Sequence, residues 1–147
     1  EARLDNFLMD KRTKQEEFRT DIEDINFNLL DATDIDKEFL EKVIEVIQEN
    51  LSSSTFDVIQ LADALAMSKS SLYRKTKAII GLSPVEFIRN VRLKQGVKML
   101  RNKSISVSEV AYTCGFSNPK YFSTCFKEEF GVTPKEFQKA DTKINKL

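Results

Sequence analysis

The 147-residue sequence contains no histidine and only two cysteines, four glycines and three prolines. Without histidine, the chain cannot form a Ser–His or Cys–His catalytic pair. The two thiols, Cys114 and Cys125, cannot by themselves supply the four ligands of a usual zinc site. The second half of the chain also lacks a Gly-rich phosphate-binding loop and a pair of carboxylates on a shared face. We therefore expect neither an enzyme nor a bound cofactor.

Long hydrophobic runs are also missing. No apolar segment approaches the roughly 20 residues that a membrane-spanning helix needs, and the N-terminus has no signal-peptide pattern. Both cysteines lie in apolar-periodic segments, as is typical of small core residues in a reducing compartment. These features predict a cytoplasmic protein without membrane contact. The sequence starts at Glu1 rather than Met, and we interpret it as a fragment of a longer protein.

The formal net charge is zero, but the charges are separated along the chain. Residues 1–50 contain 7 Lys or Arg and 15 Asp or Glu, which gives a net charge of −8. Residues 51–147 contain 16 and 8, which gives +8. A basic half favours a polyanionic partner. Ordinary solvated surface charge is the alternative, and the charge balance alone does not decide between the two.

Apolar periodicity predicts helices nearly everywhere, and no run shows the alternation of a β-strand. In residues 4–25 apolar positions recur every three or four residues, with Lys and Gln in the middle of the seam. This pattern predicts either a short coiled coil or a connector helix that rests on a neighbouring domain. Residues 26–33 are expected to form a break. A core-facing helix with an acidic outer face should follow, from about residue 34 to 51.

In the basic half, capping and stop signals divide the chain into short helices. Ser83 and Ser106 each begin the pattern of a capping box, with a Glu three residues later. Gly81, Gly115 and Gly131 are expected to end helices. These signals predict helices over about 58–66, 69–80, 84–101, 107–114, 119–130 and from 134 onward.

A unit of about fifty residues occurs twice in this half. LADALAMS at 61–68 matches VAYTCGFS at 110–117, and GLSPVEF at 81–87 matches GVTPKEF at 131–137. Each unit consists of a short helix, a tight turn, a second helix, a glycine and a capped third helix. This order is that of a helix-turn-helix unit, and its repetition argues against chance.

The second helix of each unit has an apolar stripe and an opposite polar stripe without acidic residues. A helix that reads DNA needs both, because one face packs on the core and the other must reach a groove. We therefore interpret the polar stripes as DNA-reading faces, although ordinary solvated faces of a helical bundle would look similar. The two stripes, at the same i, i+3, i+4, i+7 spacing, are Ser70, Tyr73, Arg74 and Lys77, and Lys120, Ser123, Thr124 and Lys127.

Two stretches resemble the AraC/XylS family of bacterial transcription regulators: SLYRKTKAIIGLSPVEFIRNVRL and VSEVAYTCGFSNPKYFSTCFKEEFGVTPKEF. The second contains the landmarks GFS, YF, FK, FG and TP in order. The resemblance covers about residues 36–140. It implies an all-α domain of seven helices, in which one long linker helix joins two helix-turn-helix subdomains.

The resemblance also implies a division of the chain. An amphipathic linker helix to a missing upstream receiver-type domain occupies residues 1–33, the AraC-type DNA-binding domain occupies 34–141, and a C-terminal tail occupies 142–147. Within the domain, the implied parts are a first helix-turn-helix at 56–81, a linker helix at 84–101, a second helix-turn-helix at 106–131, and recognition helices at 69–80 and 119–130.

The N-terminal third is similar to the linker between receiver and AraC-type domains in hybrid two-component sensors of gut Bacteroidetes. This likeness implies a response-regulator output that controls polysaccharide-utilisation genes. The implied partners are double-stranded DNA, upstream receiver or sensor domains of the same chain, and RNA polymerase. We expect a monomer or weak dimer for the fragment and a dimer for the full-length protein.

Two positions depart from the family pattern. Thr76 stands where the family often has Phe, which should thin the first subdomain's core. Gly96 stands in the linker helix where Ala is usual, at a cost of about 1 kcal/mol in helix propensity. We expect this glycine to loosen the coupling between the subdomains.

Side-chain chemistry assigns contacts to DNA on these faces. The fork of Arg74 suits O6 and N7 of guanine, which makes it the strongest candidate for a base contact. Tyr121 and Phe122 are assigned mainly to the core. The predicted base contacts are Ser70, Tyr73, Arg74, Asn118, Lys120, Ser123 and Thr124. The predicted phosphate contacts are Lys69, Lys77, Ser106, Lys127 and Thr133.

The linker helix should be about 27 Å long, and successive major grooves on one DNA face lie about 34 Å apart. Both recognition helices can therefore enter one duplex if protein or DNA bends somewhat. An RNA-binding module is the nearest alternative, but the aromatic residues fall on core stripes rather than on a stacking surface. A helical protein-interaction module is the second alternative. Such a module would show no salt-dependent binding to DNA.

Overall fold

The computed structural model describes residues 33–146, and in this range the chain forms helices and no strand. The all-α fold class is therefore confirmed. The predicted amphipathic helix in residues 1–33 and its coiled-coil alternative lie outside the described residues, apart from Thr33. The helices are α3 (Asp34–Glu49), α4 (Val58–Ala64), α5 (Lys69–Ile80), α6 (Pro84–Leu100), α7 (Val107–Thr113), α8 (Pro119–Phe130) and α9 (Pro134–Lys146).

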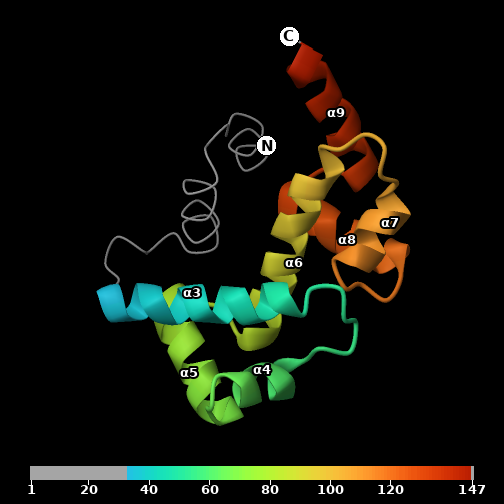
Figure 1. Cartoon of the computed structure of the whole chain (residues 1–147). Helices are drawn as coiled ribbons and strands as arrows, with labels where there is room; N and C mark the ends of the chain where they lie inside the picture. The colour runs from blue at the N-terminus through green and yellow to red at the C-terminus, as the bar shows by residue number, and fades with distance from the viewer. Residues whose placement is uncertain (1–32, 147) are drawn as a thin grey trace.

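The polypeptide is arranged around α6, which runs from a group formed by α3, α4 and α5 to a group formed by α7, α8 and α9 (Figure 1). The helix α6 contacts members of both groups. Its two ends belong to different hydrophobic cores, since residues up to Val91 pack with the first group and residues from Leu93 onward pack with the second. The domain therefore has two halves that share one helix.

Side chains at the helix ends set the lengths of these helices. The predicted capping boxes are confirmed at Ser83 and Ser106, where the serine side chain and the following glutamate satisfy each other's backbone N–H groups. Gly81 and Gly131 follow α5 and α8 in the left-handed conformation, with φ of 74° and 84°. A Cβ at either glycine would meet no atom within 4 Å, so the backbone conformation itself requires glycine there.

The two cores have matching layouts and different side chains. In the second half, edge-to-face contacts link Phe126 to Phe130 and to Phe137, at ring-centroid distances of 4.6 and 5.9 Å. The equivalent of Phe126 in the first half is Thr76, which is fully buried. Its hydroxyl donates a hydrogen bond of 3.2 Å to the backbone carbonyl of Tyr73. Thr76 is thus a core residue whose one polar atom is satisfied within its own helix.

Gly96 lies at the contact between α6 and α8, inside the second half of the domain, so the expectation that it loosens the coupling between the subdomains stays a prediction. Gly96 is buried in α6, and a Cβ built on it would lie 3.1 Å from two ring atoms of Phe122. The ring of Phe122 is itself fully buried. Glycine therefore allows α8 to approach α6 closely at this position.

A buried arginine joins the two halves. Arg92, in the middle of α6, is 7% exposed. Its guanidinium donates one hydrogen bond to the carbonyl of Ser53, at 2.9 Å, and another to the carbonyl of Gly115. Ser53 lies in the connection between α3 and α4, and Gly115 lies in the turn between α7 and α8. One side chain thereby fixes loops of both halves to the shared helix.

Candidate nucleic-acid interface

The helix α5 presents the first predicted face to solvent. Its buried side consists of Leu72, Thr76 and Ile80, and Ser68 caps its first turn by accepting a hydrogen bond from the N–H of Ser71. The opposite side is solvent-exposed and contains no acidic residue, as predicted. The exposed residues are Ser70, Tyr73, Arg74 and Lys77, preceded by Lys69 at the first position of the helix.

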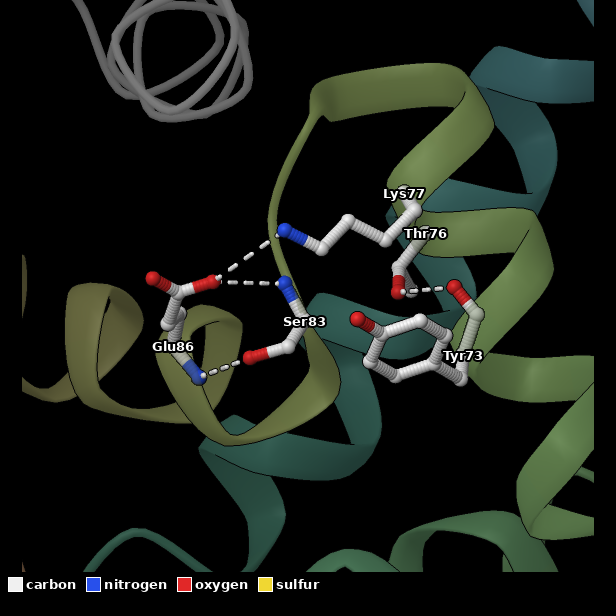
Figure 2. Close-up of polar contacts among 5 residues, drawn as sticks. All are labelled: Tyr73, Thr76, Lys77, Ser83 and Glu86. Atoms are coloured by element: carbon white, nitrogen blue, oxygen red, sulfur yellow. Dashed lines mark hydrogen bonds and ion pairs between the residues drawn. The ribbon is translucent and has the colours of Figure 1, made fainter.

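The turn between α5 and α6 holds Lys77 beside a carboxylate (Figure 2). The Lys77 ammonium lies 3.9 Å from Oε1 of Glu86. The same oxygen accepts a hydrogen bond of 2.8 Å from the N–H of Ser83. Hydrogen bonds from Ser83, and to a lesser degree the charge of Lys77, hold the pKa of Glu86 below its ordinary value. Lys77 thus has an exposed ion pair that a DNA phosphate would have to replace.

The ring of Tyr73 and the guanidinium of Arg74 stand beside a hollow in the surface. This recess, of about 770 Å³, lies between the outward face of α5 and the start of α6. Tyr73 is 49% exposed and Val85, on the opposite wall, is 58% exposed. Among the described residues, the one hydrogen bond of the Arg74 side chain is a long contact of 3.4 Å to the hydroxyl of Ser71. Its guanidinium can therefore turn to a partner at small cost.

The helix α8 presents the second predicted face. Lys120, Thr124 and Lys127 are exposed, and Ser123 is half-buried. The hydroxyl of Thr124 donates a 3.0 Å hydrogen bond to the carbonyl of Lys120. Asn118 caps the helix, since its Oδ1 accepts a 2.7 Å hydrogen bond from the N–H of Tyr121. The cap leaves the side-chain NH₂ of Asn118 as the group that remains for a further contact.

Tyr121 was expected mainly in the core, and that prediction was wrong. Its side chain is 49% exposed, and the ring lies against that of Phe116 in a tilted arrangement at a centroid distance of 5.8 Å. Phe122, by contrast, is fully buried, as predicted. The repeat indicates that position 121 is exposed and position 122 buried, because the equivalent of Tyr121 in the first unit is the polar Ser71.

The two capped helix starts predicted to meet phosphates already have acidic partners. The N–H of Ser106 donates to Oε1 of Glu109 at 3.2 Å. The N–H of Thr133 donates to Oε1 of Glu136 at 2.9 Å, and hydrogen bonds from Thr133 are the main reason that the pKa of Glu136 is lowered. A phosphate at either place would have to approach a carboxylate, so the lysines are better placed to hold DNA.

The part of the chain that the structure describes contains no helix both long and apolar enough to cross a membrane. Within the same residues, no three His, Cys, Asp or Glu side chains are grouped as a metal site would need.

A family model described as a helix-turn-helix domain matches residues 61–140, which is more than half of the chain. The matched range begins in α4 and ends in α9, so it includes both helices with outward basic faces. The chain belongs to the AraC family of DNA-binding domains. Its two helix-turn-helix units and shared α6 are the architecture that this family implies.

Two curated relatives and one solved structure are similar to this chain. The chain is 32% identical over 136 residues to "Histidine kinase P4" of Formosa agariphila, which covers 92% of this chain and 10% of the relative. It is 37% identical over 78 residues to the transcriptional activator RhaS of Escherichia fergusonii, covering 53% of this chain and 28% of the relative. The chain thus spans about a tenth and about a quarter of these proteins.

The solved structure is that of the DNA-binding domain of AdpA, a global transcriptional factor, in complex with a target DNA. It is 30% identical in sequence, and it superposes with a TM-score of 0.62 over 69% of this chain and 90% of that one. The AraC-type domain described here is therefore similar, over most of its described length, to a domain whose structure contains DNA.

Proposed function

We propose that this AraC-type domain is the sequence-specific DNA-reading output of a transcription regulator, and that α5 and α8 enter successive major grooves of one duplex. The observation that supports this most is the pair of equivalent helices, each with a buried apolar stripe and an exposed stripe without acidic residues. Such faces match the negative potential of DNA. A domain with this role needs no catalytic activity.

The geometry of α6 suits this arrangement. The helix has 17 residues, which corresponds to about 26 Å at 1.5 Å per residue. Successive major grooves lie about 34 Å apart along the duplex. The remaining distance is covered by the width of the reading helices and by a modest bend of the DNA. One domain then reads an asymmetric site.

We assign separate roles to the exposed side chains. Arg74 contacts guanine through its two parallel donors, with Ser70 and Tyr73 on the neighbouring bases. In α8, Lys120, Thr124 and the amide of Asn118 face base edges, while Ser123 lies deeper at the margin of the face. Phosphates are held by Lys69, Lys77 and Lys127, and the backbone N–H groups near Ser106 and Thr133 contribute less.

The experiment that tests this proposal is fluorescence-anisotropy binding to a pool of labelled promoter fragments at two salt concentrations. Specific recognition predicts binding that weakens steeply with salt while some fragments remain bound. Those fragments contain the operator. Stronger binding to single-stranded RNA than to duplex would instead support an RNA-binding module. No binding to DNA even at low salt, also after fusion to a constitutive dimer, would support a protein-interaction module.

We further propose that receiver or sensor domains precede this domain in a longer chain and control its pairing. The similarity to a protein named as a histidine kinase, over 92% of the present chain, supports a two-component context. The resemblance to hybrid sensors suggests polysaccharide-utilisation genes as targets and RNA polymerase as a partner. A role on the chromosome places the protein in the cytoplasm. We expect the fragment to be a monomer or weak dimer, and a tight dimer in ultracentrifugation at low micromolar concentration would contradict this.

A further inference from the structure

A second recess, of about 270 Å³, lies between the two halves of the domain. Its walls come from the connection before α4, the first turns of α6 and the turn before α8, and they include Arg89, Ser117 and Tyr121. It shares Asp57 and Val85 with the recess beside α5. The two recesses therefore adjoin, and the surface that they make together, from the outward face of α5 to the flank of α8, is called the groove below.

The guanidinium of Arg89 lies in this groove without a bonded partner in the described part of the chain. Arg89 is half-buried, and among the residues that the structure describes its side chain makes no hydrogen bond or ion pair. The nearby carboxylates are Glu86, whose pKa the charge of Arg89 helps to lower, and Asp57, which lines the same recess; neither is ion-paired with Arg89, and both accept hydrogen bonds from backbone N–H groups. Glu86 accepts from the N–H of Ser83, and Asp57 accepts from the N–H of Gln60 at 3.0 Å. A cation without a fixed partner in a concave, partly apolar site favours an anion.

We propose that this recess receives a backbone phosphate of the DNA segment that lies between the two major grooves occupied by α5 and α8. The inference rests on the proposed function. When two helices occupy successive major grooves on one face of a duplex, that face presents the minor groove and its two flanking strands between them. The groove of the protein joins α5 to α8, so it faces this segment. Arg89 supplies the charge, and the exposed hydroxyls of Ser117 and Tyr121 supply further donors.

Arg89 lies too deep in the protein surface to reach a base, so we expect it to contact a phosphate. Its side chain is half-buried in a hollow, so it cannot project far beyond the protein surface. The phosphates are the outermost groups of the duplex, whereas the base edges lie at the floor of the minor groove. A hollow that holds a cation thus fits the protruding backbone. This contact carries no sequence information by itself, but it fixes how the domain sits between its two reading helices.

The test compares wild-type protein with Arg89→Ala, Arg89→Lys and Tyr121→Phe on operator and random duplexes over a salt series. Arg89→Ala should weaken binding by about tenfold on both duplexes. It should also make the slope of log K against log salt shallower by about 0.9. Arg89→Lys should restore most of the affinity, because a lysine binds phosphate as a point charge. Lys42→Ala is the matched control, since it removes one charge from the exposed acidic side of α3.

The outcomes separate this inference from the proposed function. If Arg89→Ala leaves affinity and salt slope unchanged while wild-type protein binds the operator, the phosphate contact is wrong and DNA reading stands. If the variant loses affinity only on the operator, Arg89 reads a base and the inference is also wrong. If wild-type protein fails to bind any duplex at low salt, also after fusion to a constitutive dimer, both proposals fall.

A second measurement changes the DNA and leaves the protein intact. Single neutral methylphosphonates are placed at each position between the two halves of the operator. Wild-type protein should lose affinity at one or two of these positions, and Arg89→Ala should be insensitive at the same positions. Equal sensitivity of the two proteins at every position would overturn the contact. This measurement stands even if a substitution in the groove affects folding.

Discussion

The guanidinium of Arg92 donates a hydrogen bond to the backbone carbonyl of Gly115, 23 residues further along the chain. The turn is pressed closely against the arginine, since a Cβ on Gly115 would lie 2.3 Å from the carbonyl oxygen of Leu51 and 2.4 Å from Nη1 of Arg92. Gly115 also has φ of 88°. The junction between the two halves thus depends on one buried charge and on one residue without a side chain.

Replacing Arg92 should destabilise the domain. Arg92→Ala leaves the carbonyls of Ser53 and Gly115 without their donor, and loss of hydrogen bonds to a charged group costs about 2–3 kcal/mol. Urea denaturation measures this change in the free energy of unfolding. Arg89→Ala is the control, because Arg89 lies one turn earlier in α6 and has no bonded partner in the described residues. Equal losses in the two variants would contradict the role of Arg92 at the junction.

Enlarging Gly96 should also destabilise the domain. Gly96→Val places methyl groups beyond a Cβ that already lies 3.1 Å from the buried ring of Phe122. Overpacking of this kind costs about 1–3 kcal/mol. Thermal melting followed by circular dichroism measures the effect. Gln95→Val is a suitable control, since residue 95 is half-buried on the same helix. A melting temperature unchanged by Gly96→Val would show that α8 can move away from α6.

Removing Arg74 should abolish preference for the operator and leave weak general binding. A bidentate contact to guanine contributes about 1–3 kcal/mol of discrimination. Lys127→Ala should instead weaken binding to operator and random duplexes by the same factor, because a phosphate contact does not depend on sequence. Competition between operator and random DNA distinguishes the two effects. If Arg74→Ala weakens both duplexes equally, the side chain holds a phosphate and does not read a base.

Glu86 should contribute to stability in a pH-dependent way. Its pKa is lowered in the folded state by the hydrogen bonds of Ser83 and by Lys77. The contribution is therefore complete above the ordinary pKa of 4.5 and is lost as the pH falls through the lower folded-state value. Glu86→Gln should show a weaker fall in stability between pH 5 and pH 3, as measured by urea denaturation. An identical pH profile would mean that solvent screens these contacts completely.

The thiol of Cys114 should be protected at neutral pH. It is fully buried, and burial raises its pKa from 9.0 to about 12. Its stabilising effect as a neutral thiol is present below pH 9 and is lost as the pH rises toward 12. Iodoacetamide should therefore modify native protein slowly and unfolded protein rapidly, as followed by mass spectrometry. Cys114→Ala should flatten the decline in stability above pH 9, and fast modification of native Cys114 would contradict its burial.

Local signals in the sequence account for the helices and the two outward faces. Ser68 and Gly81 mark the ends of α5 because a cap and a left-handed residue act within one turn of the chain. The exposure of Tyr121 was missed. Tyr121 lies on the border between the apolar and the polar stripe of α8, and whether such a side chain is buried depends on residues from other parts of the fold. The contacts of Arg92 and Gly96 were missed for a related reason. Their partners lie 23 or more residues away, and no local pattern encodes such contacts.

Because α6 contributes to both hydrophobic cores, the two halves cannot slide or turn independently without breaking one of them. In the proposed complex, α6 therefore fixes the distance and the angle between the two half-sites that one domain can bind. One inserted base pair between the two half-sites shifts them by about 3.4 Å and rotates one relative to the other by roughly a tenth of a turn. A flexible tether between the halves would tolerate such a change. With a shared helix, the spacing of the two half-sites becomes part of what the domain recognises.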